Sequence, residues 1–105
     1  MANSQEPINK LLPKFIDDLG KNGRSPSTIL AYRADLEQLV TFLVKRSKPT
    51  VDLIKSEDIE SFRDSLLAEK YTPKSTSRKL NAVKTFFRWL KSNSLSDSDP
   101  SRDVS

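Results

Sequence analysis

Residues 73–92 read PKSTSRKLNAVKTFFRWLKS, and this stretch decides the fold class and suggests a function. Its apolar residues recur every three or four positions, which is the spacing of one helix face. Thr72 suits the N-cap of such a helix and Pro73 suits its first position. The stretch therefore predicts a helix with one face in a core. The residues of that face are Leu80, Val83, Phe86, Phe87 and Leu90.

The other face of this predicted helix is basic and polar. No acid occurs between Glu69 and Asp97, whereas residues 73–92 contain six lysines or arginines. A solvated face normally mixes signs, because opposite charges at i,i+4 stabilise a helix and like charges repel. The acid-free arc therefore favours a polyanionic partner, with an ordinary solvated surface as the alternative. The arc consists of Lys74, Ser77, Arg78, Asn81, Lys84, Thr85 and Arg88.

Two earlier segments show the same helical spacing. One covers residues 7–21, and we expect Gly20 and Gly23 to stop it. The other covers residues 26–46 and follows Ser25, a good N-cap. Their predicted inner faces are Ile8, Leu11, Leu12, Phe15, Ile16 and Leu19 in the first, and Ile29, Tyr32, Leu36, Leu39, Val40 and Leu43 in the second.

A third helix is predicted over residues 57–70, with Ser56 as its cap and five acids along it; the acids of its first turn place negative charge at a water-facing helix start. Residues 47–55 form a loop, the bundle as a whole allows one short extra helix, and the tail 92–105 is serine-rich and acidic. We expect the tail to be a linker or a frayed end. The inner residues expected here are Ile59, Phe62 and Leu66 in the helix, and Val51, Leu53 and Ile54 in the loop.

The bulk composition narrows the possible chemistry. The chain has 105 residues, which suggests one domain, and its formal net charge is +4. It contains no cysteine and no histidine, so disulfides, thiolate chemistry and the commonest general base are excluded. We expect no catalytic residue, no metal site and no cofactor. The absence of a long apolar run or a signal pattern predicts a cytoplasmic protein with no membrane partner.

The starts of two predicted helices resemble phosphate-binding sites. The segments SPSTIL at 25–30 and TPKSTS at 72–77 offer hydroxyls and free backbone N–H groups, with no acid to neutralise them. A helix N-terminus of this kind binds anions. Simple N-capping is the alternative for each start taken alone. The residues concerned are Ser25, Ser27, Thr28, Lys74, Ser75 and Ser77.

Two motifs resemble the core-binding, SAM-like domain of tyrosine recombinases and phage integrases, of the Xer-like or lambda-integrase-like kind. The resemblance covers residues 8–100 and includes Asp99-Pro100, where many relatives have Asn-Pro. The family pattern Ser-x-x-Thr-x-x-x-Tyr-x-x-Asp-Leu is matched by Ser25, Thr28, Tyr32, Asp35 and Leu36. The pattern Arg-x-Leu-Ser-Ala-Leu-Arg-x-Phe-Tyr is matched by Arg78, Leu80, Ala82 and Phe86, with departures at Asn81, Val83, Lys84 and Phe87.

The resemblance implies an all-α, SAM-like orthogonal four-helix bundle over residues 1–95, followed by a linker at 96–105 toward an absent C-terminal catalytic domain. It implies a domain that grips double-stranded DNA near the strand-exchange site. The expected partners are DNA, the catalytic domain of the same protein, and recombinase protomers in a synaptic tetramer. The isolated domain is expected to be monomeric. The strand-cleaving tyrosine of this family lies in the catalytic domain.

The resemblance also assigns roles by position. Arg78 and Asn81 are the expected base readers, since arginine suits guanine and asparagine suits adenine. Lys84 and Arg88 are expected to follow the DNA backbone. Two alternative functions remain. One is a helical protein-interaction module, which Leu30 and Phe42 would serve. The other is a helix-turn-helix transcription factor, which is disfavoured because the linkers around residues 20–24 and 48–55 lack the tight turn that this motif needs.

Overall fold

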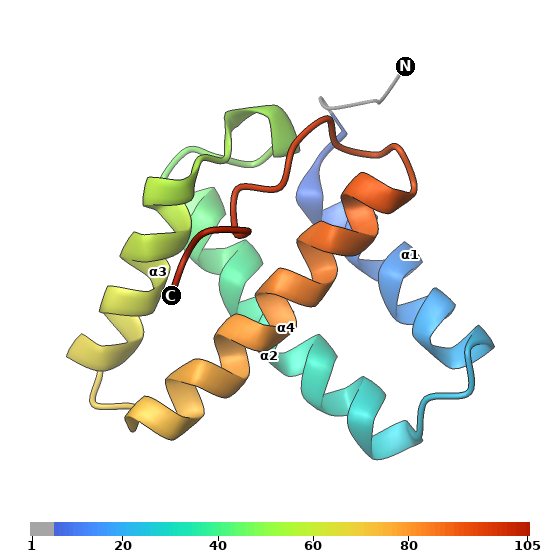
Figure 1. Ribbon diagram of the computed structural model, residues 1–105, viewed down its shortest axis with the longest axis horizontal. Helices are drawn as coiled ribbons and strands as arrows, with labels where there is room; N and C mark the ends of the chain where they lie inside the picture. The colour runs from blue at the N-terminus through green and yellow to red at the C-terminus, as the bar shows by residue number, and fades with distance from the viewer. Residues whose placement is uncertain (1–5) are drawn as a thin grey trace.

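A computed structural model describes residues 6–105, and α-helices dominate it (Figure 1). The described part contains no β-strand, although Pro7 and Thr50 form an isolated antiparallel bridge. The all-α prediction is confirmed, and the short extra helix is present as the 3-10 turn η1. The elements are α1 (Ile8–Lys21), α2 (Pro26–Lys45), η1 (Val51–Leu53), α3 (Ser56–Ala68) and α4 (Pro73–Ser92).

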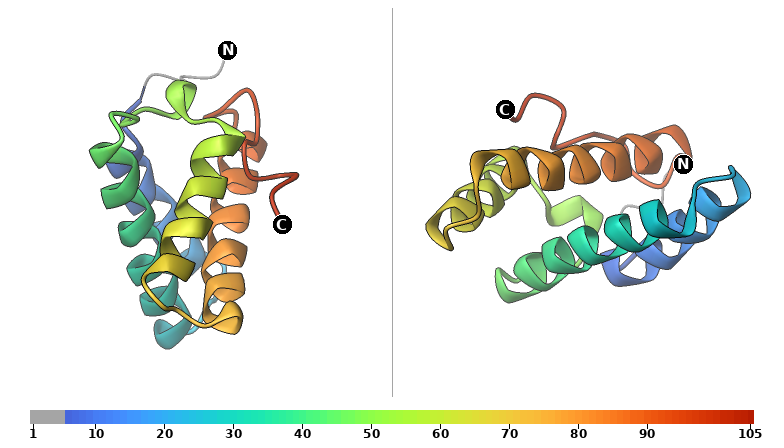
Figure 2. Two further views of the ribbon diagram at one scale, coloured as in Figure 1. Left: turned by 90° about the vertical axis from the view of Figure 1, so that its left-hand side faces the viewer. Right: turned by 90° about the horizontal axis from the view of Figure 1, so that it is seen from below.

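The helices form two layers, which the view from below in Figure 2 separates clearly. α1 and α2 lie side by side in one layer, and α3 and α4 lie in the other. α4 passes over α2 at a large angle, as in an orthogonal bundle (Figure 1). Within residues 6–105, no helix is both long enough and apolar enough to cross a membrane.

The core lies between these layers and contains the predicted apolar faces, although Ile29, Tyr32 and Val40 of α2 are only half-buried. All six predicted residues of α1 are buried, as are the predicted inner residues of α3 and α4. Aromatic rings join the layers: the Phe15 centroid lies 5.3 Å from that of Phe86 and 5.4 Å from that of Trp89. Tyr32 is half-buried and meets Phe15 edge-on at 5.9 Å. Burying a phenylalanine stabilises a fold by about 1.5–3 kcal/mol, so this cluster fixes how α4 packs on α1.

The end of α1 differs from the prediction. The helix continues through Gly20 and ends at Lys21, so Gly20 does not stop it. Gly23 has a φ of 81°, a conformation that side chains disfavour. Its N–H donates to the Gly20 carbonyl at 3.1 Å, and the Arg24 N–H donates to the Leu19 carbonyl at 3.1 Å. This pair of bonds is a Schellman motif, so Gly23 alone supplies the left-handed residue that ends the helix.

The start of α3 also differs from the prediction. The N-cap is Lys55 rather than Ser56, and the Lys55 N–H donates to Asp58 Oδ2 at 2.8 Å. Asp58 is fully buried, which contradicts the expectation of an acid that faces water. Arg46 Nε lies 3.1 Å from Asp58 Oδ1, and Lys48 Nζ lies 3.2 Å from Oδ2.

These contacts set the ionisation of Asp58. Burial alone raises its pKa, because a low-dielectric surrounding disfavours the carboxylate. The hydrogen bonds from Lys55, Lys48 and Arg46 and the positive charge of Lys48 outweigh burial, and the pKa of Asp58 is lowered from its ordinary value. Asp58 is therefore a structural carboxylate that ties the end of α2 to the start of α3.

Two further expectations need correction. Val51 and Ile54 plug the core as predicted, but Leu53 is 41% exposed because the η1 turn directs it outward. The end of the chain is not frayed, since Ser101 is fully buried and Val104 belongs to the core at 2% exposure. Its role as a linker remains a prediction, as do the domain limits 1–95 and 96–105.

Candidate nucleic-acid interface

The start of α2 gathers three hydroxyl groups. Ser25 caps the helix: its Oγ accepts a hydrogen bond from the Thr28 N–H at 3.2 Å and donates one to Thr28 Oγ1 at 2.8 Å. The Ser27 Oγ lies 3.3 Å from the Ser25 Oγ, and both serines are exposed. The first turn contains no acid. The structure therefore joins these three predicted residues into one polar, positively polarised helix tip.

The start of α4 likewise has a side-chain N-cap and no acid in its first turn. Thr72 Oγ1 accepts a hydrogen bond from the Ser75 N–H at 3.1 Å, and the first turn again contains no acid. Lys74 and Ser77 are exposed, and Ser75 is half-buried. In Figure 1 the N-terminal ends of α2 and α4 both lie along the lower edge of the molecule. Two helix tips that favour anions are thus presented on one side.

A hollow of about 240 Å³ lies between α2 and α4 and joins predicted residues from both helices. Thr28 enters it from α2, whereas Arg78 and Asn81 enter it from α4, one helical turn apart. An arginine and an asparagine at one opening provide several hydrogen-bond donors and one amide acceptor. The hollow is lined by Thr28, Ala31, Tyr32, Asp35, Arg78, Asn81 and Ala82.

A buried carboxylate is one of the groups that line this hollow. Asp35 is 4% exposed and accepts bonds from two cations of α4: Arg78 Nη1 at 3.0 Å from Oδ2, and Lys79 Nζ at 2.9 Å from Oδ1. Lys79 also donates to Gln38 Oε1 at 2.9 Å and lies 5.0 Å from the centre of the Tyr71 ring. Lys79 is therefore an internal ion-pair partner, although its sequence context is that of a surface base.

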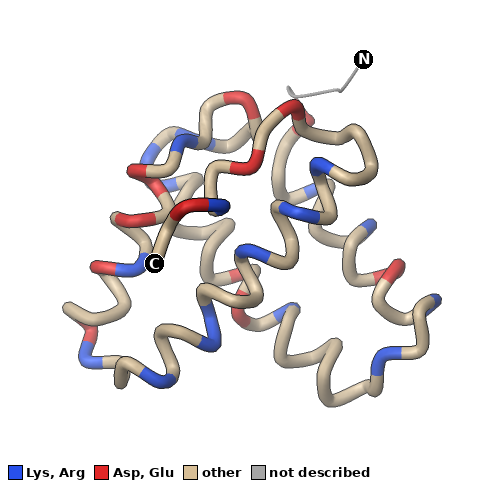
Figure 3. Tube along the Cα trace, in the orientation of Figure 1, with Lys and Arg blue, Asp and Glu red and all other residues tan. Residues whose placement is uncertain are grey.

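The remaining predicted residues lie farther along α4, which carries a row of basic positions (Figure 3). Lys84 is half-buried, whereas Arg88 is exposed. Arg88 lines two other hollows and does not join the Arg78–Asn81 opening. The structure thus divides the predicted surface into an opening at the α2–α4 crossing and a separate basic region around Arg88.

Sequence reasoning assigned Arg24 and Arg102 no role and counted Lys91 only among the bases of residues 73–92, yet all three lie near Arg88. Arg24 shares one hollow with it, and Lys91 and Arg102 share the other. The position of Arg24 next to the N-cap Ser25 was an available signal. Nothing in the local sequence indicated Arg102, because the fold-back of the tail brings it to α4.

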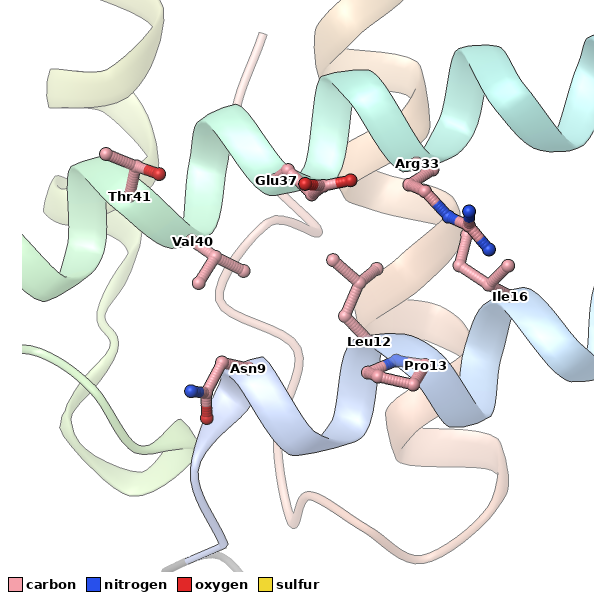
Figure 4. Close-up of a pocket in the computed structure, with 8 residues that line it drawn as sticks. All are labelled: Asn9, Leu12, Pro13, Ile16, Arg33, Glu37, Val40 and Thr41. Atoms are coloured by element: carbon pink, nitrogen blue, oxygen red, sulfur yellow. The ribbon is translucent and has the colours of Figure 1, made fainter.

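A fourth hollow, of about 390 Å³, lies between α1 and α2 and contains none of the predicted DNA-binding residues (Figure 4). Leu12, Ile16 and Val40 give it an apolar floor, and Arg33 and Glu37 stand on its α2 side. Such a groove suits a protein segment better than a phosphate. For metal ions, the described residues contain no cluster of three acidic side chains able to bind one.

Comparison with known families decides the assignment. The model of the phage integrase N-terminal SAM-like domain matches residues 12–94, which is most of the chain.

This chain belongs to the phage integrase SAM-like family.

Relatives of this SAM-like domain include tyrosine recombinases of the Xer type. XerC of Herpetosiphon aurantiacus is 29% identical over 100 residues, or 95% of this chain and 32% of the relative. XerD of Proteus mirabilis is 31% identical over 94% of this chain and 32% of the relative. XerC of Roseiflexus sp. RS-1 is 32% identical over 92% of this chain and 31% of the relative. The chain thus spans about a third of the length of these curated relatives. No solved structure matches it significantly.

Proposed function

We propose that this SAM-like domain binds duplex DNA near a strand-exchange site and positions the catalytic domain of a tyrosine recombinase. The observation that carries the proposal is the arrangement of α2 and α4. Their two acid-free helix tips lie along one edge, and Thr28, Arg78 and Asn81 line a shared opening between them. Hydroxyls, backbone N–H groups and cations are the groups that contact DNA phosphates.

The residues divide into two roles in this proposal. The two helix tips, together with the exposed Lys74, bind phosphates and so set the position of the domain on DNA. Arg78 and Asn81 reach base edges in the major groove, where arginine recognises guanine and asparagine recognises adenine. Lys84 and Arg88 add contacts along the backbone. The phosphate-binding residues are Ser25, Ser27, Thr28, Lys74, Ser75 and Ser77.

The proposed partners beyond DNA are the catalytic domain of the same protein and neighbouring protomers in a synaptic tetramer. We assign no strand-cleaving role to this chain. It has two tyrosines and no histidine. Tyr32 packs against Phe15, and the Tyr71 hydroxyl accepts a hydrogen bond from Gln38 Nε2 at 3.3 Å. Both tyrosines therefore have structural roles that account for their presence.

Salt-dependent binding to short duplex DNA tests the proposal. Each neutralised phosphate contributes about −0.9 to the slope of log affinity against log salt concentration. The double variant Lys74→Gln/Lys84→Gln is expected to reduce the magnitude of that slope by about 1–2 and to weaken binding. The matched control, Lys10→Gln/Lys45→Gln, removes the same charge from exposed positions on α1 and the end of α2. Equal effects of the two double variants, or no binding by the wild type, would refute the proposal.

A second candidate function is a helical protein-interaction module. The apolar groove between α1 and α2 and the 66% exposure of Leu30 favour it. Phe42 does not, because it packs against Phe62 with centroids 5.4 Å apart. An interaction module would bind duplex DNA weakly and without contributions from the helix tips. NMR titration with DNA distinguishes the two functions, since only the DNA-binding proposal requires amide shifts at residues 25–28 and 74–81.

A further inference from the structure

We propose that Asp35 is a positioning residue that holds Arg78 in a fixed orientation for reading a guanine, and that Lys79 preserves the positive charge of that site. This inference rests on the proposed function. It begins from an unusual position for a carboxylate: Asp35 is 4% exposed and lines the same opening as the predicted base readers Arg78 and Asn81. A DNA-binding surface would ordinarily exclude an acid.

The contact between Asp35 and Arg78 restricts the orientation of the guanidinium and leaves most of its N–H donors free. Arg78 Nη1 donates to Asp35 Oδ2 at 3.0 Å, yet its side chain remains 56% exposed. A guanidinium has five N–H donors in a rigid plane, so a single anchored nitrogen leaves donors for a base. Holding the plane before DNA arrives reduces the side-chain entropy that is lost on binding. An arginine held in this way favours the one geometry in which two donors meet the O6 and N7 of guanine.

Lys79 explains how an acid can be tolerated at this site. An Asp35–Arg78 pair alone would be neutral and would forfeit the attraction of Arg78 for DNA. Lys79 Nζ donates to the other oxygen of Asp35 at 2.9 Å, and its side chain is only 9% exposed. The three groups together keep one positive charge, and that charge is exposed on Arg78. Lys79 therefore neutralises the negative charge of Asp35 from the interior of the protein, and the positive charge of Arg78 stays available to DNA.

The orientation of Lys79 is itself well determined. Its ammonium donates to Gln38 Oε1 at 2.9 Å and faces the Tyr71 ring at 5.0 Å. Gln38 in turn donates to the Tyr71 hydroxyl at 3.3 Å. These partners hold the Lys79 ammonium inside the protein. Arg78 therefore remains the cation that faces DNA, and its sequence neighbour Lys79 does not take over that role.

The test compares base discrimination with salt dependence. The probe is a library of short duplexes with randomised sequence, bound to the 105-residue chain at one salt concentration. The decisive variant is Asp35→Ala/Lys79→Met, which removes both buried charges, leaves Arg78 no side-chain acceptor at position 35 and keeps the formal net charge unchanged. We expect the wild type to favour guanine at one position by about tenfold, the scale of one bidentate contact. The double variant should lose that preference and keep its salt slope.

Arg78→Lys is the matched control, because it retains the charge and removes the planar fork. It should also keep the salt slope and lose the guanine preference. Wild type that binds DNA without any base preference, or a folded double variant that discriminates as well as wild type, overturns this inference and leaves phosphate binding intact. Wild type that fails to bind DNA overturns the proposed function instead.

A second measurement does not depend on how the double variant folds. If Asp35 holds Arg78, NMR of the free wild-type protein should show separate signals for the Arg78 guanidinium nitrogens, since the anchored group rotates slowly. The exposed Arg88, for which no side-chain hydrogen bond is found among residues 6–105, provides the reference for free rotation. Equal, fast rotation of both guanidinium groups would overturn the inference.

Discussion

Trp89 Nε1 donates a hydrogen bond to Asp18 Oδ2 at 2.9 Å, joining α4 to α1 across 71 positions of sequence. The indole also packs on Phe15, so one side chain combines a core contact with a directed polar contact. Hydrogen bonds to charged groups stabilise proteins by about 1.5–3 kcal/mol. This residue therefore fixes the position of α4 relative to α1, on the same helix that carries the candidate DNA-binding residues.

We predict that Trp89→Phe lowers the free energy of unfolding by about 2 kcal/mol, because it removes the donor and part of the buried ring. Urea unfolding followed by circular dichroism measures the loss. Asp18→Asn is the control, since its amide oxygen can still accept the bond, and a smaller loss is expected. If the two variants lose equal stability, the charge on Asp18 rather than the bond geometry is responsible.

The second prediction concerns pH. The folded pKa of Asp58 is lowered, so its carboxylate stabilises the fold fully above its unfolded pKa of about 3.9 and this contribution is lost as the pH falls through the folded value. Asp58→Asn should cost about 2 kcal/mol at neutral pH, because three hydrogen bonds to a buried charge are weakened.

The measurement is the difference in unfolding free energy between wild type and Asp58→Asn from pH 7 downward. The difference should be constant to about pH 5 and shrink below about pH 4. Asp64→Asn is the control, since the Asp64 side chain is 65% exposed and its pair with Arg63 contributes little. A difference that does not change with pH would contradict the account of Asp58.

The third prediction is a stabilising substitution. The Thr76 hydroxyl is buried in α4 and has no hydrogen-bond partner within the described residues 6–105. A buried polar group without a partner costs about 1–3 kcal/mol. Thr76→Val keeps the shape and removes the hydroxyl, so the free energy of unfolding should rise by about 1 kcal/mol. A loss of stability in thermal unfolding would show that the hydroxyl has a partner in solution. Ser77→Ala, at an exposed neighbour, should change little.

Much of the fold could be predicted from the sequence because it depends on local periodicity. The apolar faces of α1, α3 and α4 are buried as their spacing indicated, and the caps Ser25 and Thr72 start their helices as expected. Polar residues with distant partners could not be predicted in this way. Asp58 and Lys79 have the local sequence context of surface residues, and only the packing of α2 against α3 and α4 buries them.

The candidate site was predictable to the same limited extent. Spacing on one helix placed Arg78 and Asn81 on a common face, and both do line one opening. The contribution of Asp35 was not predictable, because its contacts lie 43 and 44 positions away, on a different helix. Arg88 was assigned to the same surface from the helical wheel, but a wheel contains no information about how far apart residues lie along the axis.

The last prediction concerns the end of the chain, which the sequence suggested was a linker or frayed. Ser101 is fully buried and its hydroxyl donates to Asp99 Oδ1 at 2.6 Å, which turns the chain back so that Val104 reaches the core at 2% exposure. Val104→Ala should lower the free energy of unfolding by about 2 kcal/mol, since two buried methyl groups are lost and a cavity remains. Asp103→Ala, at the adjacent exposed position, should change stability by less than about 0.5 kcal/mol. Urea unfolding of each variant measures both changes in the free energy of unfolding. If the tail moved freely, the two variants would lose equal stability. That result would also mean that Arg102 does not lie beside Arg88 and Lys91.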